Sequence, residues 1–177
     1  MSKCIDNKNK PIFLCGFMGS GKTTIGKRIA KELSCEFTDM DDYIVSIENK
    51  SIAEIFKDSG EEYFRNLETN VIKSFKNKTG VIATGGGALL RDENARYAKE
   101  IGTVVYLDVR FNTCYVRIKD DKNRPIAAAS TRDELYKRFK QRRPIYIKNS
   151  DFSIDGNHGA LTVAKNIIEA IKNDEER

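Results

Sequence analysis

Five short apolar runs are spaced along the chain, and each has the length of one buried strand. They lie at residues 11–15, about 35–38, 81–84, 103–107 and 151–154. Segments in which apolar residues recur at helical spacing lie between and beyond them, most clearly at 22–33, 60–76, 131–141 and 160–172. Strands that alternate with amphipathic helices predict an α/β fold with a parallel sheet and helices on both faces.

Parallel strands of such a sheet end at one edge, and ligands bind beyond that edge. Three segments with candidate chemistry each follow a predicted strand: residues 16–23, the pair Asp39 and Asp41, and the glycines at 85–87. We therefore expect these segments to lie close together in the folded protein, although they are far apart in the sequence.

The segment at residues 16–23 reads Gly-Phe-Met-Gly-Ser-Gly-Lys-Thr and fits the phosphate-binding P-loop pattern. Its glycines allow a tight turn whose backbone N–H groups approach a phosphate. Lys22 adds a positive charge for the β- and γ-phosphates, and Thr23 offers a hydroxyl to Mg²⁺. A chance glycine turn is the other interpretation, but the flanking strand and helix favour the P-loop.

Asp39, Asp41 and Asp42 place three carboxylates within four residues, and such groups repel one another unless cations neutralise them. If the strand alternation continues, Asp39 and Asp41 point the same way, one serving Mg²⁺ and the other an incoming hydroxyl. The cluster also suits the N-terminus of a predicted helix at 43–49, with Asp42 as the N-cap. Beside a P-loop, the functional interpretation is favoured.

Arg65 and Glu68 lie three residues apart on a predicted helix and so share a face. Spacing alone favours a surface ion pair over an arginine that Glu68 orients toward a substrate carboxylate. The glycines at 85–87 leave an open surface where a ligand can reach the backbone. Thr84 stands where many P-loop enzymes carry an acidic residue, so metal binding would rest on Thr23 and Asp39.

The last third of the chain is rich in arginine, and a polar stretch at 119–125 interrupts its helical pattern as a lid would. A lid arginine on the transferring phosphate contributes strongly to phosphoryl transfer. A solvated basic surface is the other interpretation, and we adopt it for Arg132, Arg138 and Arg143.

Composition excludes several classes of protein. A chain of 177 residues with 40% hydrophobic and 32% charged residues suits one soluble domain, here with a polar tail at 173–177. The net charge of +5 is small and dispersed, so we expect no nucleic-acid partner. The four cysteines include no C-x-x-C and suit reduced cytoplasmic thiols. We find neither a secretory signal nor a membrane span, and a monomer is the default expectation.

Together these motifs resemble the shikimate kinase family over nearly the whole chain. The segments that carry the resemblance are residues 16–23, Phe37-x-Asp39-x-Asp41, Phe64-Arg65-x-x-Glu68, Thr84-Gly85-Gly86-Gly87, Arg124-Pro125 and Arg142-x-Pro144-x-Tyr146. The resemblance implies a P-loop kinase fold with five parallel strands in the order 2-3-1-4-5 and a lid at about 117–131. It also implies transfer of the γ-phosphoryl of ATP to the 3-hydroxyl of shikimate, with Mg²⁺, in aromatic amino acid biosynthesis.

The resemblance also implies a role for each matching residue. Catalytic roles would fall to Lys22, Asp41 and Arg124. ATP would be bound by Gly19, Ser20, Gly21, Lys22, Thr23, Thr24, Arg117, which would stack on adenine, and the lid arginine Arg124. Shikimate would be bound by Asp41, Arg65, Gly86, Gly87 and Arg142. Mg²⁺ would be held by Thr23 and Asp39.

The residues leave two other functions open. A P-loop kinase for another hydroxy acid, such as gluconate, would keep residues 16–23 but gives no reason for Arg65 and Arg142 to accompany the glycine triplet. A nucleotide-dependent switch would need no catalytic carboxylate, and the chain lacks the Asn-Lys-x-Asp guanine motif. Within the preferred interpretation, Arg143 is the second candidate for the role of Arg142.

Overall fold

The computed structural model describes residues 10–120 and 129–175, and we describe only these. The elements follow in the order β1 (Pro11–Cys15), α1 (Lys22–Leu33), β2 (Phe37–Asp39), α2 (Met40–Glu48), α3 (Ile52–Ser74), β3 (Gly80–Ala83), the 3-10 helix η2 (Ala88–Leu90), α4 (Asp92–Ile101), β4 (Thr103–Asp108), α5 (Phe111–Ile118), α7 (Arg132–Lys148), β5 (Phe152–Asp155) and α8 (Ala160–Glu175). The predicted alternation of strands and helices is confirmed.

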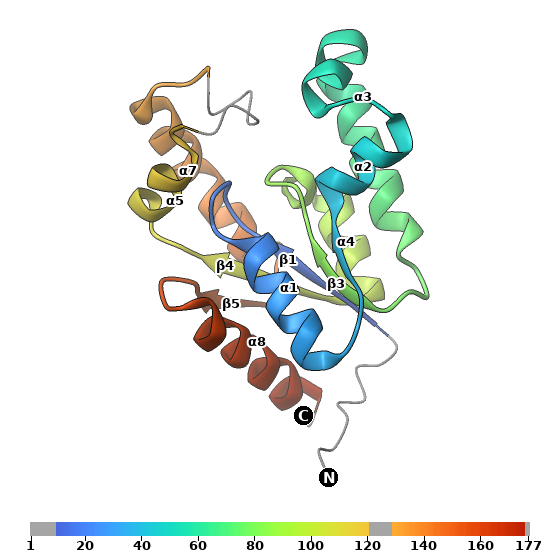
Figure 1. Ribbon diagram of the computed structural model, residues 1–177, viewed down its shortest axis with the longest axis vertical. Helices are drawn as coiled ribbons and strands as arrows, with labels where there is room; N and C mark the ends of the chain where they lie inside the picture. The colour runs from blue at the N-terminus through green and yellow to red at the C-terminus, as the bar shows by residue number, and fades with distance from the viewer. Residues whose placement is uncertain (1–9, 121–128, 176–177) are drawn as a thin grey trace.

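The five strands form one parallel sheet in the order β2-β3-β1-β4-β5, as the resemblance implied. The central strand β1 is fully buried, which explains its continuous apolar sequence. The two edge strands are short, with three residues in β2 and four in β5. All strands run in one direction, so their carboxyl ends share one edge of the sheet (Figure 1).

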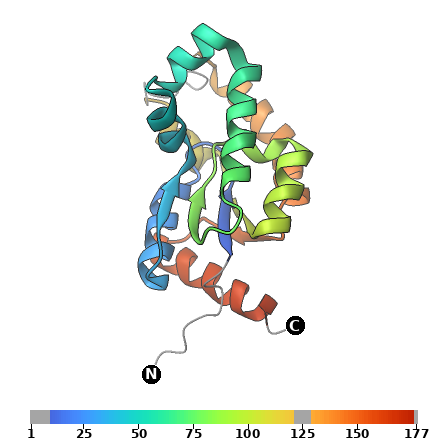
Figure 2. The same cartoon turned by 90° about the vertical axis from the view of Figure 1, so that its right-hand side faces the viewer.

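Helices cover both faces of the sheet, and the side chains of β1 alternate between two cores (Figures 1 and 2). Ile12 and Leu14 pack in the core that includes residues of α1 and α8. Phe13 and Cys15 pack in the core that includes residues of α2, α3, α4 and α7. Each core excludes apolar surface from water and so stabilises the layered arrangement.

Helix α3 is longer than the predicted segment at 60–76 and contains a kink. It begins at Ile52 with a capping box between Ser51 and Glu54, whose Ser-x-x-Glu spacing is a local sequence signal. Gly60 breaks the helix with φ of 81° and ψ of 172°, a conformation that favours glycine. Figure 1 shows α2 and the first part of α3 extending beyond the sheet at the end where the P-loop lies.

Two further predicted boundaries were wrong. Helix α7 does not stop near residue 141 but continues through Pro144 to Lys148. Helix α8 reaches Glu175, so residues 173–175 of the predicted polar tail are helical. Most of the predicted lid, including Arg124, lies outside the described residues. Within the described parts of the chain, no helix combines the length and apolar character needed to cross a membrane.

Candidate active site

The P-loop connects β1 to α1, and its backbone explains its glycines. Gly19 and Gly21 have φ values of 77° and 92°, in the left-handed region that favours glycine. At Gly19 a β-carbon would also lie only 2.6 Å from the carbonyl oxygen of Cys114 in α5. Glycine therefore both shapes the loop and lets it pack against α5.

Two cations lie against this loop. The Lys22 ammonium donates to the carbonyl oxygens of Gly16 and Phe17, at 2.8 and 3.1 Å. Arg117, from α5, donates through Nη1 to the carbonyl of Gly19 at 2.9 Å. The loop thus gathers positive charge beside the N-terminus of α1, an arrangement suited to phosphate.

Asp39 connects the P-loop helix to the next helix. Its Oδ2 accepts a hydrogen bond from the Thr23 hydroxyl at 2.7 Å, and its Oδ1 accepts one from the Asp41 backbone N–H at 3.1 Å. Asp39 is therefore the N-cap of α2, and Asp42 does not have the capping role that the alternative interpretation of the cluster gave it. Asp41 lies in the first helical turn, so strand alternation does not set its direction.

The Thr23 hydroxyl and the Asp39 carboxylate are oxygen donors of the kind that Mg²⁺ prefers. Their 2.7 Å separation lets both contribute to one ion. In the described parts of the chain no cluster of three His, Cys, Asp or Glu side chains is suited to hold a metal. Thr23 and Asp39 therefore fit a Mg²⁺ ion whose other ligands are phosphate oxygens and water molecules. The Thr84 hydroxyl, in contrast, is committed to the carbonyl of Leu14 within the sheet.

Gly85 brings two carboxylates together at the end of β3. A β-carbon at Gly85 would lie 2.6 Å from Oδ1 of Asp41 and 2.8 Å from Oε1 of Glu68. Any other residue would push these side chains away, since contacts this short do not occur. The sequence predicts an open ligand surface at residues 85–87, but it does not predict that Gly85 brings Asp41 and Glu68 together.

Glu68 is buried, so the prediction of a surface ion pair with Arg65 was wrong. The two side chains are 1% and 13% exposed, and Arg65 Nη1 lies 2.7 Å from Glu68 Oε2. The other oxygen, Oε1, has no hydrogen-bond partner among the residues that the structure describes. Burial raises the pKa of Glu68 to about 7, the nearby charge of Asp41 adds to this, and Arg65 opposes it.

The glycine turn at 85–87 lies between two arginines. A β-carbon at Gly87 would overlap the guanidinium of Arg65, so glycine lets this arginine lie directly on the backbone. The carbonyl of Gly86 accepts hydrogen bonds from Arg142 Nη1, at 3.3 Å, and from the Tyr146 hydroxyl, at 2.5 Å. The P-loop is close by, since a β-carbon at Gly86 would lie 3.7 Å from the Met18 backbone nitrogen.

Comparisons with known proteins identify the family. The family model described as Shikimate kinase matches residues 18–172. The shikimate kinase of Persephonella marina is 44% identical over 136 residues, which cover 76% of this chain and 82% of that protein. The shikimate kinase of Aquifex aeolicus is 38% identical over 162 residues, which cover 91% and 95%. The chain belongs to the shikimate kinase family.

A solved structure extends this similarity to three dimensions. The shikimate kinase of Acinetobacter baumannii in complex with shikimate is 34% identical and superimposes with a TM-score of 0.88. The match covers 95% of this chain and 96% of that one. The fold of the shikimate kinase family is therefore present, and with it the class of ATP-dependent small-molecule kinases.

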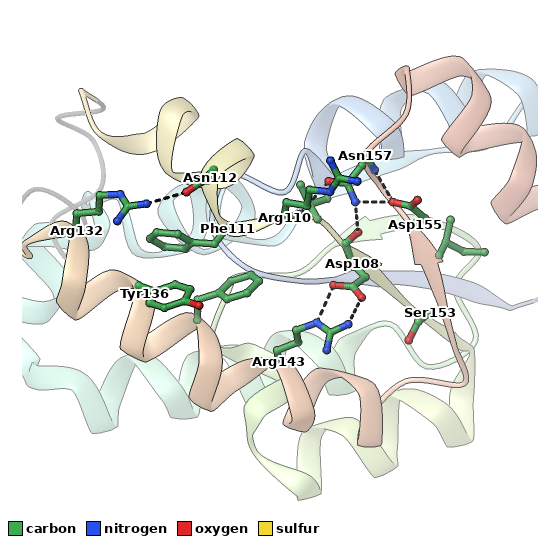
Figure 3. A pocket seen from close by; sticks show the side chains of 13 residues that line it. Asp108, Arg110, Phe111, Asn112, Arg132, Tyr136, Arg143, Ser153, Asp155 and Asn157 are labelled. Carbon is green, nitrogen blue, oxygen red and sulfur yellow. Dashed lines mark hydrogen bonds and ion pairs between the residues drawn. The ribbon is translucent and has the colours of Figure 1, made fainter.

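In this shikimate kinase family member, the structure separates Arg143 from Arg142. Arg143 forms a bidentate ion pair with Asp108 on a different side of α7, at 2.6 and 3.1 Å (Figure 3). Arg143 and Asp108 line a cavity of about 710 Å³, and no residue of the P-loop is among the residues that line it. Arg143 therefore does not replace Arg142 at the glycine turn, nor is it simply solvated.

Arg132, which we predicted to be solvated, also has contacts in this cavity. It donates to the Asn112 side chain at 2.9 Å and lies over the ring of Phe111 (Figure 3). The sequence motif includes Tyr146 without indicating a role for it, although its position four residues after Arg142 places both side chains on one helix face. The spacing indicates only that Tyr146 accompanies Arg142, whereas its contact with the glycine turn depends on where α7 lies in the fold.

Proposed function

We propose that this protein transfers the γ-phosphoryl of ATP to the 3-hydroxyl of shikimate, in the pathway to aromatic amino acids. The observation that carries the proposal is the convergence of a P-loop, a carboxylate and two arginines on one glycine turn. Family membership supports the same reaction. Phosphoryl transfer needs such a site because its catalysis depends on positioning and on neutralisation of charge.

At the phosphate end, Lys22 and the backbone amides of Gly19, Ser20 and Gly21 would hold the phosphates. Arg117 lies across the same loop and would stack on the adenine. Thr23 and Asp39 would bind Mg²⁺, which supplies charge neutralisation on the phosphates when present. Thr24, exposed in the first turn of α1, would contact the nucleotide beside them. The lid arginine Arg124 would act on the transferring phosphate, and this role rests on the sequence resemblance.

At the acceptor end, Arg65 and Arg142 would bind the carboxylate of shikimate. Both guanidinium groups lie at the glycine turn, where Gly86 and Gly87 would contact the substrate through their backbone. The buried Glu68 fixes one fork of Arg65, so that the arginine meets its ligand already oriented. Asp41, at the start of α2, would hold the reacting hydroxyl between the two ends of the site.

The test is ADP release by the purified protein with Mg-ATP, with and without shikimate. We expect shikimate to raise the rate by several orders of magnitude and the product to carry phosphate on the 3-hydroxyl, as phosphorus NMR can determine. Asp41→Asn should bind ATP normally and lose most of kcat. Bound ATP without any response to shikimate would overturn the proposal, and an equal response to gluconate would change the substrate.

We further propose that the chain acts as a single-domain monomer in the cytoplasm without nucleic acid. The small net charge and the free thiols of Cys15, Cys35 and Cys114 support this. Light scattering coupled to size exclusion tests the oligomeric state, and a mass of two chains would contradict it.

A further inference from the structure

The carbonyl of Gly86 has two donors, and both come from one face of α7. Arg142 Nη1 lies 3.3 Å from this oxygen and the Tyr146 hydroxyl lies 2.5 Å from it. A carbonyl oxygen has two lone pairs, so both hydrogen bonds can exist together. The two donors are four residues apart and therefore lie one above the other on the helix.

The two donors differ in strength and in freedom to move. Tyr146 is 2% exposed, and its ring stacks on that of Tyr106 with centroids 5.4 Å apart and an interplanar angle of 21°. Its hydroxyl is therefore held in place. Arg142 is only partly buried and makes the longer bond. Of the two donors, Arg142 is the one that can leave the carbonyl.

We propose that Tyr146 is a positioning residue that keeps the Gly86 carbonyl bonded when Arg142 turns to the carboxylate of the substrate. The inference rests on the proposed function, in which Arg142 binds that carboxylate. Departure of Arg142 is inexpensive only if the partly buried carbonyl retains another donor, because an unpartnered polar group is costly. Without Tyr146, the carbonyl would compete with the substrate for Arg142.

The hydrogen bond from Tyr146 to Gly86 also fixes the position of the glycine turn relative to the Arg65 guanidinium. Gly87 follows Gly86 directly, and the Arg65 guanidinium lies on it. A carbonyl that stays bonded to Tyr146 holds this backbone still while Arg142 moves. Tyr146 would thus serve both arginines of the acceptor end without touching the substrate.

The test uses Tyr146→Phe, which removes the hydroxyl and keeps the stacked ring. We expect kcat/KM for shikimate, at saturating Mg-ATP, to fall on the order of tenfold. The KM for ATP should stay within about twofold, because the hydrogen bond removed by this change goes to the glycine turn and not to the P-loop. Thermal unfolding checks that the variant is folded.

Tyr106→Phe is the matched control. It removes one hydroxyl from the other ring of the same buried stack, and that hydroxyl bonds to Asp108 at 3.1 Å rather than to the glycine turn. It should therefore leave kcat/KM for shikimate within about twofold of the wild-type value. An equal fall in both variants would assign the effect to the stack and overturn the inference.

A double-mutant cycle separates positioning from general structural support. In the Arg142→Ala background no arginine needs release, so adding Tyr146→Phe should lower kcat/KM for shikimate by no more than about threefold, the part that acts through the glycine turn and Arg65. A second tenfold loss in that background would overturn the inference while leaving the proposed function standing. If Arg142→Ala alone leaves kcat/KM unchanged, the assignment of Arg142 in the proposed function fails, and the role of Tyr146 with it.

Discussion

Glu68 holds an ionisable group where water hardly reaches. Only 1% of its side chain is exposed, and burial raises its pKa to about 7. The charge of Asp41 raises it further, whereas the charges of Arg65 and Arg91 lower it. The pKa of this carboxyl therefore lies well above the ordinary value of a glutamate, because burial disfavours the charged form.

This shift predicts how stability changes with pH. The folded protein binds the Glu68 proton more tightly than the unfolded chain, in which the pKa is near its ordinary value of 4.5. Its contribution to the unfolding free energy therefore falls as pH rises from about 4.5 to about 7. Urea unfolding at pH 5 and pH 8 should show the wild type losing on the order of 1 to 3 kcal/mol more than Glu68→Gln. If the unfolding free energies of the wild type and of Glu68→Gln changed equally with pH, the raised pKa of Glu68 would be contradicted.

Arg142 and Arg143 are neighbours in sequence with different surroundings. Arg142→Ala should lower kcat/KM for shikimate at least tenfold while ATP affinity survives, because the charged hydrogen bond to the substrate carboxylate that the proposed function assigns to Arg142 would be lost. Arg143→Ala removes the ion pair with Asp108, in a cavity that no P-loop residue lines, and should leave both quantities within about twofold. Steady-state kinetics with each substrate varied measures both. A collapse of ATP affinity in Arg142→Ala would refute the assignment.

At the scale of the element, the glycine turn after β3 depends on the absence of a side chain. In Gly87→Ala the added methyl would displace the Arg65 guanidinium, so we expect the KM for shikimate to rise about tenfold or more. Gly159→Ala is the control, because a β-carbon there meets no atom within 4 Å. Steady-state kinetics measures the KM for shikimate in both variants. Similar KM values in the two would show that Arg65 can move aside without loss of substrate binding.

Elements with local signals were predictable from the sequence. The P-loop, the five strands and the capping box at Ser51 each depend on a short pattern, and the structure contains each of them. The end of α7 was not predictable in this way, because Pro144 usually ends a helix but is accommodated here. Asp39, and not Asp42, is the N-cap because β2 ends at Asp39 and α2 begins at the next residue.

The site was predictable in its residue types but not in its contacts. Arg65 and Glu68 share a helix face on spacing alone, and only the packing of α3 against the strand ends decides that the face is buried. The contact of Tyr146 with Gly86 joins residues 60 positions apart, and such a pairing follows from the placement of α7. Long-range packing is what the sequence patterns do not contain.

For the whole molecule, metal should matter for the reaction and not for the fold. The Thr23 and Asp39 side chains already bond to each other, so helix α2 keeps its cap without an ion. We expect EDTA to stop shikimate-dependent ADP release, added Mg²⁺ to restore it, and the unfolding temperature without nucleotide to stay the same within about 1 °C. Calorimetry with and without EDTA checks this, and a marked drop would reveal a structural ion.

The sheet ends on both sides in a short strand, and this affects how copies of the protein meet. An unpaired strand edge is a template on which another chain can add a strand. Here that template is three residues long at β2 and four at β5, and the exposed Ser153 and Asp155 place polar groups along the second. Two copies colliding in a crowded solution therefore find too little backbone to hold each other, which protects the folded protein against aggregation through its sheet.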